Sequence, residues 1–422
     1  MLLLHISDIH FRRGEAGTAM DPNFHLRNEL VRDAEARCAE LGAPDAILLS
    51  GDIAFSGHQE EFDFATQWLQ TLCQRCGTSL GAVFVCPGNH DVDRSVSGRS
   101  LIQALHRDIK QTESMLLDQR LRDQLTDADT GKLLYESIAV YNRFAVQFFC
   151  DLLPPKQTTT VRELFLNDGS KLCLWGLNST FVSHIDVRGQ LCVDPSYLHI
   201  TRESGVEHIV MCHHPYEWLR QNVTLKDHLG NVSRLQLFGH EHTNRIEVGR
   251  DWIRIAASAA HPDRTEPGWE PGYNLIELSV DGTGDQRFLD VGVHVRVWQT
   301  SPDQFRPKLD KDQTPVFRQK IKLNNWTRPA GAPVKTTHAE TEPAVATEPR
   351  TDPMRNLRDI SIRFFKLNLS QKSAIAGKLG LLADEDIDVP DFERFRRVFN
   401  RACEKDLVKE LEQEIVKFEE TR

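Results

Sequence analysis

The chain has 422 residues, of which 40% are hydrophobic and 27% are charged, and its formal net charge is −10. This length predicts two or three structural units of a soluble globular protein, and the negative charge disfavours a broad, sequence-independent grip on nucleic acid, although it leaves room for a local basic groove. The apolar runs are about as long as strands and residues 1–4 lack the basic segment of a signal peptide, so we expect a cytoplasmic protein that contacts no membrane.

The nine cysteines do not form a regular spacing pattern. Cys73 and Cys76 make a single CxxC pair, which is compatible with a redox pair or half of a zinc site, but its position in a helical pattern favours coincidence. Other cysteines lie in apolar periodic runs and are predicted to be reduced core thiols. These are Cys38, Cys86, Cys150, Cys173 and Cys212.

Three short apolar runs in the first ninety residues predict buried strands over 2–6, 46–50 and 82–86. Helical periodicity follows the first two, over 26–41 and 62–72. Alternating strands and helices predict a parallel sheet with covering helices. Such sheets bind ligands at the carboxyl ends of their strands, which makes the residues that follow each strand the candidates for a site.

Residues of about 95–152 show a helical pattern and are predicted to be an insertion, either a cap near the site or a cover for the sheet. Strands are predicted again at 172–175, 208–212 and 235–238, where each run again leads into polar residues. Four later runs alternate in hydrophobicity and predict antiparallel strands of a second sheet packed on the first. They cover 252–256, 273–278, 288–293 and 295–298.

Composition divides the chain into three parts. Residues 1–326 form the predicted catalytic domain. Residues 327–353 are rich in proline and threonine and predict a linker, because they cannot bury enough apolar surface to fold. Residues 354–422 show renewed helical stripes without clustered catalytic residue types, which predicts a small all-α domain with an adaptor role.

Metal-binding residue types follow five of the predicted strands. Asp8 and His10 alternate, so both can face one point, and Pro87 and Gly88 predict a tight turn that delivers the three polar residues after it. Imidazole and carboxylate ligands suit Zn, Fe or Mn. Seven donors, which are the residues collected below without His90 and Asp91, are too many for one catalytic ion but fit two ions that share a carboxylate. The collected residues are Asp8, His10, Asp52, Asn89, His90, Asp91, His213, His240 and His242.

The order and spacing of these blocks over residues 1 to about 300 resemble the calcineurin-like metallophosphoesterase superfamily. This resemblance implies a four-layer α/β/β/α sandwich with two divalent metal ions, Mn being favoured over Fe or Zn. It implies that His90 binds the phosphate or protonates the leaving oxygen and that Asp91 orients His90. The implied ligands are Asp8, His10, Asp52 and His242 for the first metal, and Asn89, His213 and His240 with the bridging Asp52 for the second, with His214 as the alternative to His213.

The resemblance also implies a phosphoric ester hydrolase, a phosphodiesterase in which a metal-bridging hydroxide attacks phosphorus in line. The opening block, residues 4–11, resembles bacterial cyclic-nucleotide phosphodiesterases, and the metal blocks are also similar to those of repair nucleases. A nucleotide or nucleic-acid phosphodiester is therefore the expected substrate. Arg12, Arg13 and Arg94 flank two of the blocks and are candidates to contact phosphate.

Residues 354–422 resemble the small helical adaptor domains that are fused to effectors in bacterial conflict and signalling systems. This resemblance keeps a second function open, an effector nuclease for DNA or RNA that a protein partner recruits through this domain. A third hypothesis, a non-catalytic binding scaffold on the same fold, is disfavoured because no ligand of the family's set is missing.

Overall fold

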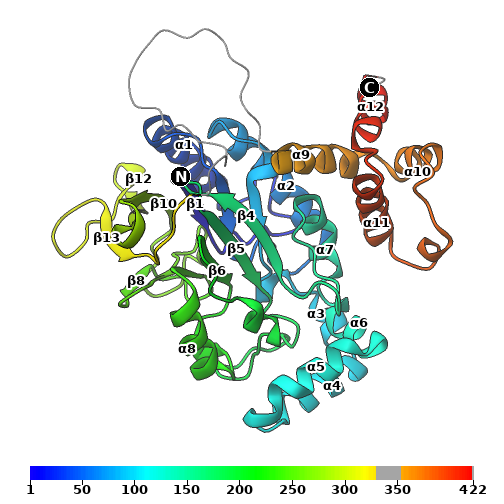
Figure 1. Cartoon of the computed structure of the whole chain (residues 1–422), viewed down its shortest axis with the longest axis horizontal. Coiled ribbons are helices and arrows are strands. Elements are labelled where there is room, and N and C mark those ends of the chain that lie inside the picture. Colours follow the sequence, from blue (N-terminus) through cyan, green and yellow to red (C-terminus); the bar gives the residue numbers. More distant parts are fainter. Residues whose placement is uncertain (329–352, 421–422) are drawn as a thin grey trace.

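The structure is a computed structural model that describes residues 1–328 and 353–420. It contains two β-sheets, surrounding helices and a small helical domain (Figure 1). The predicted linker lies almost wholly outside the described residues. A continuous hydrophobic core includes residues of both sheets, among them Leu4, Leu48, Leu174 and Leu237. None of the described helices has the length and apolar character that crossing a bilayer requires.

The first sheet has the strand order β12-β11-β10-β1-β2-β3, and β13 also pairs with β11. Its three N-terminal strands are parallel, as the alternation of apolar runs and helical stripes predicts, whereas β10 to β13 pair antiparallel. The bounds are β1 (Leu2–Ile6), β2 (Ala46–Leu49), β3 (Val83–Val85), β10 (Gly272–Asp281), β11 (Phe288–Thr300), β12 (Asp303–Pro307) and β13 (Phe317–Lys322).

The second sheet has the order β4-β5-β6-β7-β9-β8. Its inner strands β5, β6, β7 and β9 are parallel, and the two edge strands are antiparallel to their neighbours. The bounds are β4 (Thr160–Phe165), β5 (Lys171–Leu177), β6 (Val206–Cys212), β7 (Leu235–Phe238), β8 (Arg245–Val248) and β9 (Ile253–Ala256).

The expectation that the four late apolar runs form the second sheet is wrong in its pairing. Strand β10 pairs with β1 and so extends the first sheet, while β9 lies parallel to β7 in the second. The runs at 288–293 and 295–298 are one strand, β11. Alternating hydrophobicity indicates that a segment is an extended strand. It does not indicate the partner strand, because pairing depends on long-range packing.

Helices α1 (Phe24–Leu41) and α2 (Gln59–Arg75) form the connections between the three parallel strands, and α8 (Asn222–Val232) connects β6 to β7. Helices also occupy most of the predicted insertion. They are α3 (Arg94–Ser97), α4 (Ser100–Gln111), the 3-10 helix η3 (Ser114–Leu116), α5 (Leu117–Thr126), α6 (Ala128–Glu136), α7 (Ala139–Ala145) and the 3-10 helix η4 (Val146–Phe148). The five predicted core thiols are buried.

The C-terminal domain has its own small core, in which Phe364, Phe395 and Phe399 are buried together. Helix α9 contributes to both cores, because its Ile362 packs into the core of the sheets while Phe364 packs into the small one. The domain consists of α9 (Pro353–Lys366), α10 (Leu369–Lys378), α11 (Asp391–Glu404) and α12 (Val408–Glu419), beside α2 and α7 (Figure 1).

Candidate metal centre

The residues predicted from the strand ends converge on one place in the fold. They follow β1, β2 and β3 of the first sheet and β6 and β7 of the second, so the carboxyl edges of both sheets contribute. Among the described residues, several sets of three potential ligand atoms lie within 4.8 Å of one another. These sets are Asp8, His10 and His242; Asp8, Asp52 and His213; His10, Asp52 and His90; and His213, His214 and His240.

Asp52 lies at the centre of this cluster and is almost completely buried. Its Oδ2 atom is 3.3 Å from Nε2 of His10 and 3.3 Å from Nε2 of His213. Its Oδ1 atom accepts a hydrogen bond of 2.7 Å from the backbone N–H of His90. One carboxylate oxygen therefore faces two imidazoles from different sheets, which is the arrangement that a carboxylate shared by two cations needs.

The hydrogen bonds of two histidines show which ring nitrogen is available as a ligand. Nδ1 of His213 is 2.8 Å from the carbonyl oxygen of Ser50, which can only accept, so Nδ1 carries the proton. In His242, Nδ1 is 2.6 Å from a carboxylate oxygen of Glu266, and Nε2 is 3.3 Å from Oδ1 of Asp8. In the neutral rings both Nε2 lone pairs thus point at carboxylate oxygens, and only a cation or a proton can lie favourably between them.

The short contacts between carboxylates and imidazoles also shift the pKa values of these groups. Burial opposes ionisation of Asp52, but the charge of His213 and hydrogen bonds from His213 and His10 outweigh it and hold the pKa of Asp52 well below its usual range. Burial likewise opposes protonation of His213, yet Asp52 raises its pKa to about 9. Asp8 and Glu266 raise the pKa of His242 to about 10 against the effect of burial. A divalent cation would replace the protons that these imidazoles retain.

Asn89 and His240 complete the cluster on the side of His213. Oδ1 of Asn89 is 3.1 Å from Nε2 of His213 and 3.1 Å from Nδ1 of His240. Nδ1 of His214 lies 2.8 Å from the hydroxyl of Ser179, and its Nε2 atom is buried without a hydrogen bond. Of the two neighbouring histidines, His213 is the one that faces Asp52.

Five of the candidate ligands have a left-handed backbone, which residues other than glycine adopt rarely. Such conformations cost about 1–3 kcal/mol each and concentrate at functional sites. Here the rest of the fold holds them in place, and sequence patterns give no sign of them. The φ angles are 54° for Asp8, 53° for His10, 53° for Asp52, 70° for His240 and 54° for His242.

Two glycines leave room for the site. Gly51 has φ of +97°, and a Cβ atom there would lie 2.6 Å from Nδ1 of His213. Gly88 has φ of −110°, which any residue can adopt, so the tight turn expected from the sequence is not what requires it. A Cβ atom on Gly88 would lie 2.1 Å from Oδ1 of Asp52. Gly88 is needed because the loop backbone passes directly against that carboxylate.

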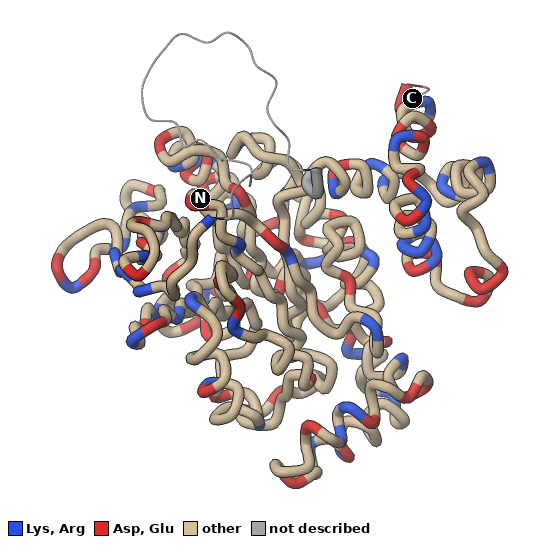
Figure 2. The backbone as a smooth tube through the Cα atoms, in the orientation of Figure 1, with Lys and Arg blue, Asp and Glu red and all other residues tan. Residues whose placement is uncertain are grey.

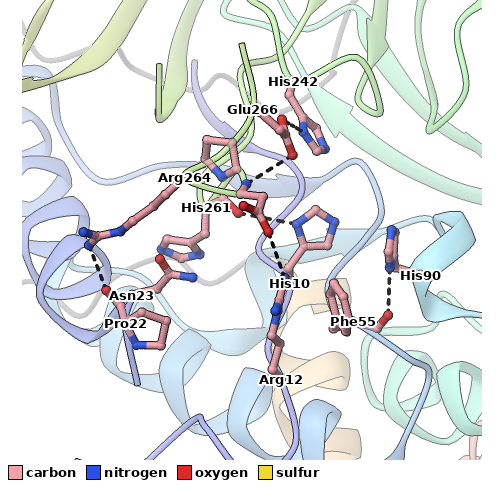
Figure 3. A pocket seen from close by; sticks show the side chains of 12 residues that line it. His10, Arg12, Pro22, Asn23, Phe55, His90, His242, His261, Arg264 and Glu266 are labelled. Carbon is pink, nitrogen blue, oxygen red and sulfur yellow. Dashed lines mark hydrogen bonds and ion pairs between the residues drawn. The ribbon is translucent and has the colours of Figure 1, made fainter. Parts of the chain in front are cut away.

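His90 is oriented by a different group from the one expected. Its Nδ1 atom donates to the carbonyl oxygen of Phe55 over 2.7 Å (Figure 3). Asp91 instead accepts 2.8 Å hydrogen bonds from the backbone N–H groups of Ala54 and Gly88. The expectation that Asp91 orients His90 is therefore wrong, because the turn directs the carboxylate back to the loop backbone. Burial and the nearby Asp52 raise the pKa of Asp91 to about 8.

A cavity of about 390 Å³ opens beside the centre and is lined by His10, His90 and His242 (Figure 3). Arg12 also lines it, with its guanidinium 3.9 Å from the centroid of the Phe55 ring and 3.6 Å from a carboxylate oxygen of Asp263. Arg13 and Arg94, which the sequence suggested as phosphate contacts, do not line this cavity.

Sequence reasoning missed several residues that shape the centre. Glu266 holds His242, the carbonyl group of Phe55 holds His90, and the ring of Trp218 stacks edge-on with His240 at 4.1 Å between centroids. Glu266 lies in a loop between strands and follows no apolar run, so no local pattern marks it. Phe55 acts through its backbone, which no residue type can reveal.

This arrangement of carboxylates and imidazoles at the edges of two sheets defines a metallophosphoesterase. The chain belongs to the calcineurin-like phosphoesterase family, whose model matches residues 1–244. The resemblance seen in the sequence is thereby confirmed. A model of the GTPase-associated adaptor domain matches residues 356–417, which confirms the adaptor-like character of the C-terminal domain.

A curated relative is an uncharacterized metallophosphoesterase-like protein, YydB of Bacillus subtilis, which is 30% identical over 125 residues. The match covers 29% of this chain and 24% of the relative, so this chain spans about a quarter of that protein. Solved structures include Vps29 of Entamoeba histolytica complexed with zinc, at 12% identity and a TM-score of 0.29, covering 76% of this chain and 99% of that one. The sulfate thiohydrolase SoxB of Thermus thermophilus has 14% identity and a TM-score of 0.33, covering 70% and 56%.

Proposed function

We propose that the chain is a dinuclear metal-dependent phosphodiesterase that hydrolyses phosphodiester bonds of nucleotides or nucleic acid. The observation that carries this proposal is the orientation of His213 and His242. Both rings give their Nδ1 protons to fixed acceptors, and their Nε2 atoms lie 3.3 Å from the carboxylate oxygens of Asp52 and Asp8. Such a donor set fits borderline divalent cations.

The proposed ligands follow from the contacts around Asp52. The ligand atoms of Asp8, His10 and His242 form one close set, and Asn89 contacts both His213 and His240. We assign the first group with Asp52 to one ion and the second group with Asp52 to the other, with Mn favoured over Fe or Zn. Two divalent cations held here would supply positive charge to the phosphate oxygens and acidify a water molecule.

In this proposal His90 donates a proton to the leaving alkoxide. Its Nδ1–H is committed to the carbonyl group of Phe55, and the ring lines the cavity beside the metal centre. The carbonyl group fixes the ring orientation, so the other nitrogen, Nε2, is the atom that can hold the transferable proton. Arg12, on the wall of the same cavity, can pair with a second oxygen of the phosphate.

The substrate is proposed to be recognised within the cavity rather than on an extended face. Its volume of about 390 Å³ lies in the range of small-ligand sites. In the view of Figure 2, Lys and Arg residues are interspersed with Asp and Glu along the backbone of both domains. A small nucleotide, or the end of a single strand that reaches the cavity, suits this distribution.

A second candidate function is an effector nuclease that acts on DNA or RNA. It is favoured by the adaptor domain at residues 356–417, which gives the enzyme a means of recruitment by a protein partner. In this version the same metal centre cleaves nucleic acid, and the C-terminal domain decides where cleavage occurs.

A substrate panel tests these proposals. Protein reconstituted with Mn²⁺ would be assayed with bis(p-nitrophenyl) phosphate, cyclic AMP, single- and double-stranded DNA, and RNA, beside the Asp52→Asn variant as a control for contaminating activity. Hydrolysis of cyclic AMP favours the nucleotide enzyme, and cleavage of nucleic acid alone favours the nuclease. Bound Mn²⁺ without hydrolysis of any of these diesters would contradict both and leave the binding scaffold.

A further inference from the structure

The loop that carries Asn89 and His90 follows the shortest strand of its sheet. Strand β3 has only three residues and lies at the edge, where β2 is its partner. A short edge strand is held by a ladder on one side only, so its position depends on other contacts. The 3-10 helix η1 (Leu80–Ala82) leads directly into β3, and contacts made there set where the strand begins.

A buried arginine of the catalytic domain fixes one part of this segment. Arg162 of β4 donates from Nη1 to the carbonyl oxygens of Ala82 over 3.1 Å and Gly81 over 3.5 Å, and from Nη2 to those of Val83 over 2.8 Å and Phe148 over 3.0 Å. Its residual exposure is 6%. These carbonyl groups are thus satisfied by a side chain instead of a neighbouring strand.

A second buried arginine reaches the same segment from the C-terminal domain. Arg358 of α9 donates from Nε to the carbonyl oxygen of Gly81 over 2.7 Å. The next residue, Asp359, accepts a 3.2 Å hydrogen bond from the N–H of the same glycine. Consecutive residues of α9 therefore hydrogen-bond both the carbonyl oxygen and the N–H group of Gly81 in η1. Ile362, one helical turn further on, anchors this helix in the core of the sheets.

We propose that Arg358 is a positioning residue for the candidate metal centre, acting from the C-terminal domain through η1 and β3 on the Asn89–His90 loop. The proposal rests on the proposed function, since it assigns a second task to the domain that is expected to bind a partner. A partner that shifts α9 removes the two contacts of Gly81 with this helix and leaves the longer one from Arg162, which loosens β3 and changes the geometry of the loop. Recruitment and catalysis are then coupled through one short strand.

The helix offers a matched control for the test. Arg363 also lies on α9, but its guanidinium bonds Glu412 and Glu419 of α12, inside the C-terminal domain. Arg358→Met and Arg363→Met remove the same donor group from the same helix and keep an unbranched side chain. Hydrogen exchange of residues 83–91, followed by mass spectrometry, would be compared in the full-length wild type and both variants, with Mn²⁺ binding measured by calorimetry.

Arg358→Met is expected to accelerate exchange over 83–91 and to lower kcat on a diester by roughly 3- to 10-fold with KM little changed, a size typical of coupling mutations. Arg363→Met is expected to leave both unchanged. Arg358→Lys, which keeps a buried donor, should recover part of the protection, and it replaces the methionine variant if that variant does not fold.

Equal exchange over 83–91 in folded Arg358 variants and in Arg363→Met would overturn the proposal. Loss of protection in both Arg358→Met and Arg363→Met would also overturn it, because the effect would then belong to the stability of the helical domain. If the wild type hydrolyses no diester, the proposed function fails, but the exchange measurement still decides whether Arg358 positions the loop.

Discussion

His213 and Asp52 come from different sheets and face each other with 3.3 Å between Nε2 and Oδ2, while Nδ1 of the same histidine is committed to the carbonyl group of Ser50. The imidazole therefore cannot satisfy the carboxylate unless its second nitrogen is protonated or a cation lies between them. The apoprotein and the metal-bound protein are thus expected to differ in stability.

Replacement of Asp52 by asparagine tests this relationship. Mn²⁺ at about 100 times its dissociation constant should raise the free energy of unfolding of the wild type by about 2.7 kcal/mol. Asp52→Asn should lose most of this gain, because the carboxylate shared by both ligand groups is gone. Thermal denaturation with and without Mn²⁺ measures it, and Asp285→Asn, at an exposed position, is the control. An equal metal-dependent shift in Asp52→Asn would refute the shared carboxylate.

Glu266 is expected to act on the metal through His242. Its carboxylate lies 2.6 Å from Nδ1 of that ring and fixes the orientation of Nε2. Loss of such a partner typically lowers metal affinity or activity by about 10–100-fold. Glu266→Gln should show this loss in Mn²⁺ titrations. The control is Glu270→Gln, whose carboxylate pairs with Lys308 away from the centre, and a loss of equal size there would argue for a general effect on the loop.

The role of His90 can be separated from metal binding by the choice of leaving group. If its Nε2 protonates the departing oxygen, His90→Gln should slow hydrolysis of a diester with an alkoxide leaving group by about 10²–10⁴-fold. With p-nitrophenolate, which leaves without a proton, the loss should be far smaller. Mn²⁺ content is expected to stay at the wild-type level. Equal losses with both leaving groups, or loss of the metal, would show that His90 acts in another way.

The stability of the apoprotein should depend on pH through His5. This ring is fully buried with Nε2 2.9 Å from the hydroxyl of Ser50, and burial lowers its pKa from 6.5 to about 4. The pKa of His5 is lower in the folded chain than in the unfolded chain, so the folded state is not penalised above pH 6.5, where the ring is neutral in both. As the pH falls towards 4, the unfolded chain takes up the proton first, and the free energy of unfolding decreases by about 3 kcal/mol.

His5→Gln should therefore lose less stability than the wild type between pH 7 and about pH 4.5. Urea denaturation in the presence of a chelator measures the difference without a contribution from bound metal. His25→Gln is the control, because the side chain of His25 is 62% exposed. Parallel pH profiles for the wild type and His5→Gln would show that this histidine is not the source of the dependence.

The two members of an ion pair between the domains, Arg396 and Asp151, should depend on each other for their effect on stability. Arg396 of α11 lies 3.3 Å from Oδ1 of Asp151, whose side chain is completely buried. Burial raises the pKa of Asp151. Arg396→Met should destabilise the protein by about 3–5 kcal/mol at pH 8, because it leaves a buried carboxylate without its partner. The loss should shrink at lower pH, where the carboxyl group is neutral.

A double mutant completes this test. Adding Asp151→Asn to Arg396→Met should restore most of the lost free energy of unfolding, since the unpaired charge is then removed as well. If the double mutant is as unstable as Arg396→Met alone, the loss comes from the contact between the guanidinium and the ring of Phe149, 4.6 Å away, and not from the charge.

The candidate site was predictable from the sequence where residue type and strand position coincide. Asp8, Asp52 and His213 each follow an apolar run, and parallel strands bring such positions to one edge. Glu266 was not predictable, because it reaches the centre from a loop through tertiary packing. The direction of Asp91 was mispredicted for a related reason: adjacency in the chain says nothing about where a side chain points within a 3-10 turn.

The same limit applies to the fold. The parallel order of β1, β2 and β3 followed from helices of suitable length between them. The partner of β10 could not be predicted, because the alternating hydrophobicity of this strand is equally compatible with either sheet. Only its packing against β1 places it in the first sheet.

The left-handed backbone of five candidate ligands has an evolutionary consequence. At Asp8, Asp52 and His240, replacement by glycine would relieve the backbone strain and so offset part of the free energy that is lost with the side-chain contacts. In a lineage released from selection for metal binding, glycine would therefore be tolerated more readily at these positions than at ligands with an ordinary backbone. In relatives of this chain, glycine at these positions would be an early marker of lost catalysis, appearing while the fold remains intact.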